Sequence, residues 1–579
     1  MNGKVLVSAV SIILVVGVAI GAVVVVRNKS NESGISAHQN TVMTMCQNTQ
    51  DQKLCHETLS SVKVNDTSDP KAFLAAVVED TTKSVIKALN MSDRLLVEHG
   101  SSNNEGLKMS LNDCKQLLES AMDSLELSTH LLGNGSIEDV NERTPDFRNW
   151  LAAVISYQQA CMEGFDENNE GEKQVRTQLQ QEGVNEMVKF TGVALDIMSD
   201  LAQILESFGL KLDVKPASRR LMEVDSEGYP TWFSASDRKL LGKLKKKIKK
   251  AKSQPTVVVA KDGSGQFRTI TDAINAYPKN GLAPGARYVI LVKAGVYAEY
   301  VTVPKTAVNV LMYGEGAGRT IITGRKNFAE GVKTMNTATF ANLGTGFIAK
   351  GITFENTAGA AGHQAVAFRN QGDMSAFFDC AFVGYQDTLY VQTNRQFYRN
   401  CDISGTIDFI FGVSTTLIQN SRIILRRPMD NQFNTVTADG TAEDRMPTGI
   451  VIQNCDILPE PALFPARFQL KSYLGRPWKQ FSKTVVMESR IGDVIHPDGW
   501  FPWQGNMYLD TLFYAEHNNV GPGANVDRRV RWRGYRGLLN KQQAAAFTAA
   551  EFLKGGVGSR AEDWLRATQI PFDLGFTKP

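Results

Sequence analysis

Several patterns that identify common enzyme classes are missing from this 579-residue chain. It contains no Gly-x-Ser-x-Gly nucleophile elbow, and no serine or cysteine nucleophile motif accompanies His363. The glycine-rich stretch Gly314–Gly318 is not followed by Lys-Ser/Thr, so it predicts a turn and not a phosphate-binding loop. The net charge is only +3 and one basic run is too local to indicate nucleic-acid binding. Serine hydrolases, nucleotide-binding enzymes and nucleic-acid-binding proteins are therefore disfavoured.

Charged residues are absent from Val5 to Val26, a run of about 22 residues near the N-terminus. At a helical rise of about 1.5 Å per residue, such a run spans a bilayer core. The run is long, rich in β-branched residues and ends directly in Arg27, which favours an uncleaved or late-cleaved signal anchor over residues 1–30 rather than a cleaved signal peptide. Either reading takes the chain into the secretory pathway. Five Asn-x-Ser/Thr sequons in the first quarter agree with a luminal location: Asn28, Asn31, Asn65, Asn90 and Asn134.

Proline and glycine are sparse across residues 39–207, where apolar residues recur at three- and four-residue spacing. The pattern predicts an all-α helical bundle. Four of the seven cysteines lie in this region, and an even number in a secreted segment indicates two disulfides. Three connectivities are possible, and the short separation of the first two cysteines favours Cys46–Cys55 together with Cys114–Cys161.

Residues 208–254 form a linker in which "RKLLGKLKKKIKKAK" carries nine basic residues and no acid. Two dibasic stretches followed by bulky apolar residues, Arg219–Met222 and Arg238–Leu241, suit cleavage by a processing protease of the secretory pathway. A solvated charge run is the plainer interpretation. A basic amphipathic helix that binds a membrane surface or a polyanion is a third possibility, because apolar residues recur every four positions from Leu240.

From Thr256 onward, short β-branched and aromatic runs alternate with Gly, Asn and Asp, and no helical segment separates them. Several runs end in Asn or Asp followed by a small residue, and Cys380, Cys401 and Ser421 recur at intervals of about 20 residues. A repeat of this length, with one strand-turn unit in each, is typical of a solenoid. Residues 255–579 are therefore predicted to form an all-β parallel β-helix with an internal ladder of small residues.

Two aspartates, Asp387 and Asp408, stand 21 residues apart, and Asp408 interrupts the apolar run "GTIDFIFG". Residues one coil apart in a parallel β-helix are separated by roughly 4.8 Å, so the two acids are expected to face each other. Two carboxyl groups that close cannot both ionise cheaply, which would supply one nucleophile and one general acid. The alternative is an Asp that caps a turn or pairs with an Arg.

Other polar residues recur at matching positions. Gln364 lies 22 residues before Gln386, so two side-chain amides could donate hydrogen bonds to a developing oxyanion. In "YLGRPW", Arg476 could hold a carboxylate or an acidic substrate, and Trp478 could provide a flat face for a sugar ring.

The segments "GITFENTAG", "HQAVAFR", "GYQDTLYV", "GTIDFIFG" and "YLGRPW" closely resemble the signature segments of plant pectin methylesterases, over about residues 255–575. Residues 39–207 resemble the inhibitor-like pro-domain of such enzymes, a four-helix bundle with two disulfides. The resemblance implies a right-handed β-helix that removes methyl groups from pectin in the cell wall, without metal or cofactor. It also implies a possible interaction between the pro-domain and the enzyme.

The same resemblance implies a role for each matching residue. Asp408 would attack the methyl ester carbonyl, and Asp387 would protonate the departing methanol and then activate water. Gln386 would stabilise the oxyanion. The implied substrate-binding residues are Thr334, Gln364, Arg476 and Trp478. The chain departs from the family pattern at Ser421, which replaces the usual partner of Cys401, and at Met335, which replaces a usual Phe.

Two rival functions remain open. A β-helix polygalacturonase-type glycosidase would also use paired carboxylates, but the Gln-Asp pairing favours an acyl oxyanion, which a glycosidic transition state does not form. An inhibitor-like binding protein with an inactive β-helix is disfavoured because the acid, amide, Arg and Trp positions are all intact.

Overall fold

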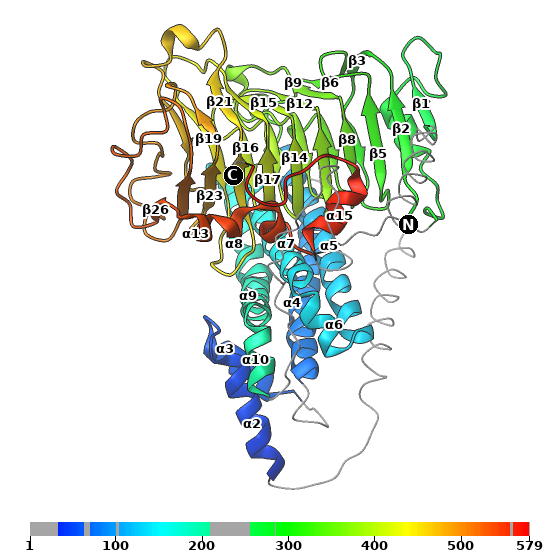
Figure 1. The fold of residues 1–579 in the computed structure, drawn as a ribbon. Helices are drawn as coiled ribbons and strands as arrows, with labels where there is room; N and C mark the ends of the chain where they lie inside the picture. The colour runs from blue at the N-terminus through cyan, green and yellow to red at the C-terminus, as the bar shows by residue number, and fades with distance from the viewer. Residues whose placement is uncertain are drawn as a thin grey trace, which may run out of the picture.

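The computed structural model describes residues 33–62, 70–99, 104–208, 255–283, 285–555 and 560–577. A helical region is followed by a domain of parallel strands, and in Figure 1 the long helices extend away from one side of that domain. Together these parts confirm the predicted fold class, a helical bundle followed by a parallel β-helix. The predicted anchor at residues 1–30 and linker residues 209–254 lie outside the described residues. Within the described ranges, no helix is both long enough and apolar enough to cross a membrane.

The helical region is built from four long helices, α4, α5, α7 and α9, which pack against one another around a shared core. Its helices are α2 (Ser33–Cys46), α3 (Gln52–Ser60), α4 (Pro70–Glu98), α5 (Glu105–Asn134), α6 (Ile137–Glu142), α7 (Thr144–Glu163), α8 (Glu170–Leu179), the π-helix η1 (Gln180–Val184), α9 (Asn185–Ser199) and α10 (Leu201–Ser207). The side chain of Asn104 caps α5 by accepting a hydrogen bond from the Leu107 amide, and a proline lies in the first turn of α7.

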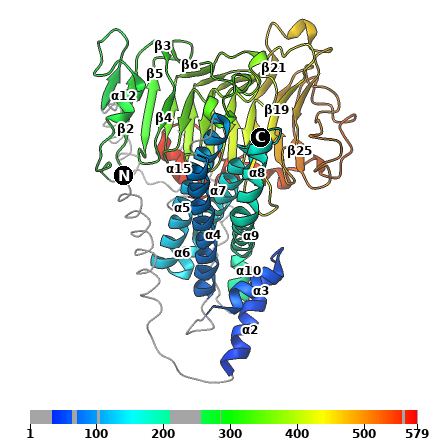
Figure 2. The same ribbon diagram turned by 180° about the vertical axis from the view of Figure 1, so that it is seen from behind.

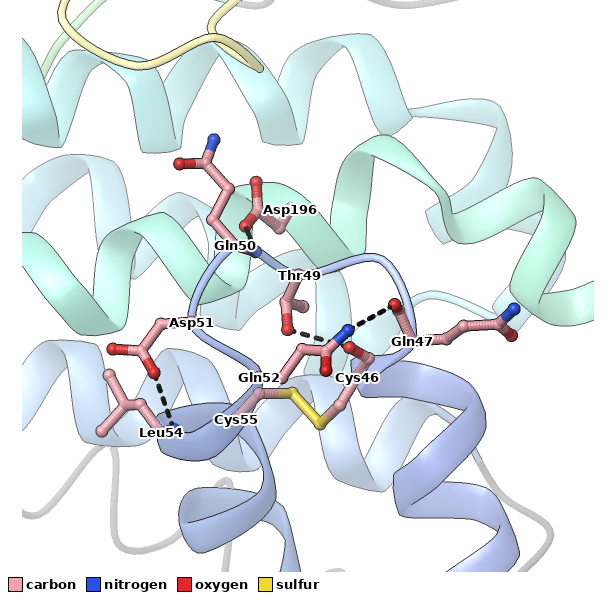
Figure 3. The surroundings of a disulfide bond; sticks show 9 residues. All are labelled: Cys46, Gln47, Thr49, Gln50, Asp51, Gln52, Leu54, Cys55 and Asp196. Carbon is pink, nitrogen blue, oxygen red and sulfur yellow. Dashed lines mark hydrogen bonds between the residues drawn. A yellow bond between two sulfur atoms is a disulfide. The ribbon is translucent and has the colours of Figure 1, made fainter.

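Disulfides join Cys46 to Cys55 and Cys114 to Cys161, the pairing that the sequence spacing favours. Figure 3 shows the first, at the turn between α2 and α3. In that turn the main-chain amide of Gln50 donates a hydrogen bond of 2.7 Å to the side chain of Asp196 on α9. This bond connects the disulfide-closed turn to the bundle. The two sequons that fall in the described residues, Asn90 and Asn134, are exposed.

The β-helix consists of three parallel sheets. The first sheet contains, in order, β1 (Val257–Val259), β2 (Tyr288–Val292), β5 (Val310–Gly314), β8 (Ile348–Lys350), β11 (Ser375–Phe378), β14 (Arg395–Arg399), β17 (Thr415–Gln419), β20 (Gly449–Gln453), β23 (Lys483–Met487), β25 (Phe513–His517) and β26 (Tyr535–Leu538). The second contains β22 (Ser472–Gly475), β19 (Asn434–Asp439), β16 (Ile410–Gly412), β13 (Leu389–Val391), β10 (Phe368–Asn370), β7 (Phe340–Asn342) and β4 (Val301–Val303). The third contains β24 (Arg490–Ile491), β21 (Asp456–Pro459), β18 (Arg422–Leu425), β15 (Asp402–Gly405), β12 (Ala381–Val383), β9 (Thr353–Asn356), β6 (Thr320–Gly324) and β3 (Gly295–Ala298).

Short helices complete this domain: α12 (Ile270–Asn275), η2 (Phe328–Glu330), η3 (Thr334–Thr337), η4 (Ala360–Gly362), η5 (Phe464–Ala466), α13 (Lys541–Ala544), η6 (Ala545–Phe547), α14 (Ala549–Phe552) and α15 (Ala561–Thr568). The coil length is constant around the strands that carry the predicted repeat. Leu389 pairs with Phe368 on one side and Ile410 on the other, 21 residues away in each direction. Aromatic side chains stack inside the coils, as in the pair of Phe377 and Tyr398 at 4.5 Å.

Small residues at the turns form the internal ladder that the repeat predicts. The amide of Cys401 donates to the Ser421 hydroxyl at 3.0 Å, and the amide of Ser421 donates to the Cys455 sulfur at 3.3 Å. Each ladder residue follows an Asn or Asp with positive φ, a conformation that these residues tolerate better than most. Cys380, Cys401 and Cys455 are free, buried thiols.

Candidate active site

Asp387 and Asp408 occupy equivalent positions on neighbouring coils. Each lies two residues before a strand of the second sheet, and those strands pair with Leu389 opposite Ile410, so the register continues from Asp387 to Asp408. Both residues have positive φ, 63° and 51°, and both are buried, with exposed fractions of 7% and 5%. Each of these two turns thus holds one carboxyl group in a strained backbone conformation, and the two groups lie one coil apart.

The carboxylate of Asp408 is held from two sides. Arg476 donates from Nε to Oδ1 at 2.9 Å and from Nη2 to Oδ2 at 2.6 Å, a bidentate ion pair. The hydroxyl of Thr435 donates to Oδ1 at 2.6 Å. Such donors stabilise a buried anion and fix its orientation.

Asp387 has a different environment. Burial, together with the negative charge of Asp408, raises the pKa of the Asp387 carboxyl well above its ordinary value, and the charge of Arg476 opposes this only in part. A carboxyl group with a raised pKa keeps its proton at higher pH and can act as an acid. The two neighbouring turns therefore combine a proton donor, Asp387, with a carboxylate, Asp408, that an arginine holds.

The two glutamines predicted to lie one coil apart do so. The main-chain amide of Ala365, next to Gln364, donates to the main-chain carbonyl of Gln386 at 3.2 Å. Both glutamines are partly exposed, unlike the acids. The main chain thus places Gln364 one coil from Gln386, which directly precedes Asp387.

Trp478 belongs to an aromatic cluster beside the acids. Tyr390 and Phe411 stack at 4.3 Å, and Phe411 meets Trp478 edge-on at 6.0 Å. The guanidinium of Arg476 lies 4.3 Å from the ring centroid of Trp503, a cation–π contact. Sequence reasoning missed these companions. Tyr390 and Phe411 each follow an Asp by three residues, and this shared spacing could have predicted that they stack beside the acids. Trp503 lies in an irregular loop, where no periodicity indicates its position.

Thr334 begins η3, a short helix that contacts the helical region. Met335 packs against the core of the bundle, and the ammonium of Lys333 lies 2.7 Å from Glu172 of α8. Asn336 donates a hydrogen bond to Asp113 of α5. The structure therefore places Thr334 on the part of the β-helix that the helical region covers.

The helical region makes further contacts along this face. Glu163, at the end of α7, pairs with Lys479, the neighbour of Trp478. Ser156 donates to the Gln392 carbonyl at 2.8 Å, and Asp146 pairs with Arg395 at 2.6 Å. In Figures 1 and 2, which view the molecule from opposite sides, the ends of α5, α7 and α8 lie beside the β-helix. The resemblance implied a possible interaction between the two parts of the chain, but it did not identify the residues that make it. In the structure, α7 is buried around its whole circumference from Trp150 to Gln158.

Two other features lie apart from the acids. A surface hollow of about 440 Å³ lies over the turns near Asp379, Asn400 and Asn420, where Arg422 pairs with Asp402; it contains none of the predicted site residues. Within the described ranges, no three His, Cys, Asp or Glu side chains are grouped as metal ligands would be. The expectation of a site without metal or cofactor stays a prediction.

Comparison with known proteins matches both parts of the chain. Residues 256–556 match the family described as pectinesterase, and residues 40–197 match the family described as plant invertase/pectin methylesterase inhibitor. The chain is 38% identical to pectinesterase 4 of Arabidopsis thaliana over 99% of this chain and 100% of that protein. It is 37% identical to pectinesterase 3 of Citrus sinensis over 95% and 91%, respectively. The solved structure of pectin methylesterase from carrot is 48% identical and covers 56% of this chain and 99% of its own, with a TM-score of 0.54.

Proposed function

The chain belongs to the pectinesterase family, and on this premise we propose that its β-helix hydrolyses the methyl esters of methylated polygalacturonate to pectate and methanol in the cell wall. The observation that carries the proposal is the pair of buried aspartates one coil apart, of which one is held by Arg476 and the other has a raised pKa. Family membership also argues against the glycosidase and inactive-binder alternatives.

In the first half of the reaction, the Asp408 carboxylate attacks the ester carbonyl carbon and forms a new C–O bond. The carbonyl electrons move onto oxygen, where the amides of Gln386 and Gln364 donate hydrogen bonds. As the oxyanion collapses, the bond to the methoxy oxygen breaks and Asp387 transfers its proton to that oxygen. Methanol leaves, and the galacturonosyl carbonyl stays bound to Asp408 as a mixed anhydride.

In the second half, the Asp387 carboxylate removes a proton from water while the water oxygen attacks the substrate carbonyl carbon. The bond to Asp408 breaks and returns that carboxylate to its ionised form. Asp387 is protonated again, and the product acid loses its own proton to solvent. Trp478 and Thr334 bind the sugar chain in this scheme.

Asp408→Asn and Asp387→Asn test this assignment. We expect each to reduce methanol release by at least about 1,000-fold, because the nucleophile or the proton donor is lost. Melting temperature and circular dichroism serve as folding controls. Near wild-type turnover by folded Asp408→Asn would contradict the covalent mechanism.

We further propose that the helical region blocks access to this site until the linker is cut. Its contacts with Lys333, Met335 and Lys479 flank the residues assigned to substrate, Thr334 and Trp478. Cleavage by a processing protease at Arg238–Leu241 or Arg219–Met222 would then free the enzyme. Methanol release should rise when the purified full chain is cut in the linker and the helical part is removed, and an unchanged rate would contradict this role.

Localisation follows from the same scheme. The N-terminal apolar segment would hold the precursor at a membrane of the secretory pathway, and the mature enzyme would begin near Gly242 in the wall. N-terminal sequencing of wall-extracted protein tests this, and a wall form that retains the helical region would contradict it.

A further inference from the structure

Thr435 makes an unusual set of contacts with the segment that carries Asp408. It is fully buried, at 0% exposure, near the start of β19. Its hydroxyl accepts a hydrogen bond from the Asp408 amide at 2.9 Å and donates one to Asp408 Oδ1 at 2.6 Å. Its main chain donates to the Thr406 carbonyl at 3.1 Å. One residue on the next coil thus holds both the backbone and the side chain of Asp408.

The backbone explains why a hydroxyl is needed there. Ile410 pairs with Thr437, so the same register sets Asp408 opposite Thr435. Asp408 lies in the turn before β16 with a φ of 51°, a conformation that costs free energy for a non-glycine residue. A buried amide without an acceptor would add to that cost. The Thr435 hydroxyl supplies the acceptor.

The hydroxyl also makes the two carboxylate oxygens of Asp408 unequal. Each oxygen has two lone pairs in the carboxylate plane. Oδ1 accepts from the Thr435 hydroxyl at 2.6 Å and from Arg476 Nε at 2.9 Å, so both of its lone pairs are engaged. Oδ2 accepts from Arg476 Nη2 at 2.6 Å, and its remaining contact, with Nε, is the longer 3.1 Å branch of a shared donor. Oδ2 therefore keeps the more available lone pair.

From this geometry we infer that Thr435 is a positioning residue for ester hydrolysis, which holds Asp408 in its left-handed turn and directs Oδ2 to the ester carbonyl. The inference rests on the proposed role of Asp408 as nucleophile. Thr435 does not touch substrate in this scheme. It acts through Asp408, so its loss should slow the chemical step and leave substrate binding in place.

The test compares Thr435→Val, which keeps the shape and removes the hydroxyl, with Thr435→Ser, which restores it. Thr320→Val is the matched control. The Thr320 hydroxyl is also fully buried, accepts from the Glu315 amide at 3.0 Å and donates to the Val292 carbonyl at 3.2 Å, but it lies on β6 of another sheet. Every variant is prepared as the full chain, cut in the linker and freed of its helical part, and kcat, KM and melting temperature are measured.

We expect Thr435→Val to lower kcat by roughly tenfold to a hundredfold, with KM changed by less than about twofold, because a small misplacement of a reacting group has an effect of this size. Thr435→Ser should restore kcat to within about threefold of wild type. Thr320→Val should lower the melting temperature and leave kcat unchanged.

Asp408→Asn distinguishes failure of the proposed nucleophile from failure of the positioning role of Thr435. If folded Asp408→Asn is inactive while Thr435→Val keeps wild-type kcat, the role of Thr435 is wrong and the proposed nucleophile stands. If Thr435→Val and Thr320→Val lose kcat in proportion to lost folded protein, Thr435 is only structural and the inference fails. An active, folded Asp408→Asn overturns both.

Discussion

Substitution of Asp146 should weaken the docking of the helical region on the β-helix. Asp146 is fully buried on α7, and its Oδ1 accepts from Arg395 Nη1 at 2.6 Å. Arg395, with 2% of its side chain exposed, also makes a bidentate pair with Asp373 of its own domain. Asp146→Asn keeps the size of the side chain and removes the charge that crosses the interface.

The magnitude follows from what each partner retains. Removal of one member of a buried ion pair costs about 3–5 kcal/mol when the other charge is left alone. Here Asp373 still neutralises Arg395, so the loss is closer to one charge-assisted hydrogen bond, about 1.5–3 kcal/mol. Because about 1.4 kcal/mol corresponds to a tenfold change in affinity, we expect docking to weaken roughly 10- to 100-fold.

After the linker is cut and the two parts are separated, the helical region is titrated into the β-helix. Binding is measured by calorimetry, so the result does not depend on catalytic activity. Glu186→Gln is the control, since Glu186 pairs with Lys87 inside the helical region and both are 54% exposed. A double-mutant cycle with Arg395→Gln should give a coupling of about 0.5–3 kcal/mol. Wild-type affinity for Asp146→Asn, or no coupling to Arg395, would refute the docking described here.

Three further outcomes are expected. Burial raises the pKa of Asp113 to about 6, against an ordinary 3.8, so docking favours the protonated form of this carboxyl group. The affinity of the helical region for the β-helix should therefore fall as pH rises from about 4 to about 6. The same titration with Asp113→Asn should show a flatter pH profile. Trp478→Ala should raise KM for methylated polygalacturonate roughly 3- to 10-fold by loss of an aromatic face, and an unchanged KM in initial-rate measurements would remove it from the binding site. Cys114→Ser should destabilise the helical region by about 2–5 kcal/mol in chemical denaturation, while methanol release by the cut, isolated β-helix stays unchanged.

The acid pair was predictable from the sequence because the coil length is constant where it occurs. Phe368, Leu389 and Ile410 are successive partners at 21-residue intervals, so counting along the chain is equivalent to moving one coil along the β-helix. Beyond Ile410 the interval changes. Ile410 pairs with Thr437 after 27 residues, and Thr437 pairs with Gly475 after 38. Longer connections between strands hide the register, and Thr435 could not be assigned to Asp408 by counting.

The residues that join the helical region to the β-helix could not be predicted from the sequence for a different reason. Amphipathic periodicity reports which face of a helix is apolar, and it is the same whether the polar residues meet solvent or another domain. The interface residues on the helical side, among them Asp113, Asp146 and Glu172, are polar and scattered over three helices. Only their burial in three dimensions distinguishes them from ordinary surface acids.

Ser421 shows how a departure from the family pattern can leave the fold intact. A serine cannot form the disulfide that the resemblance implies at this position, so the covalent link is lost. The Ser421 hydroxyl instead accepts a hydrogen bond from the Cys401 amide at 3.0 Å and donates one to the Gln419 carbonyl at 3.0 Å. The ladder therefore keeps a polar partner for each buried amide at this step, which is what a buried turn requires. This turn joins β17 of the first sheet to β18 of the third, whereas the acids precede strands of the second sheet. The change therefore removes a covalent link without altering the groups proposed to carry out the chemistry.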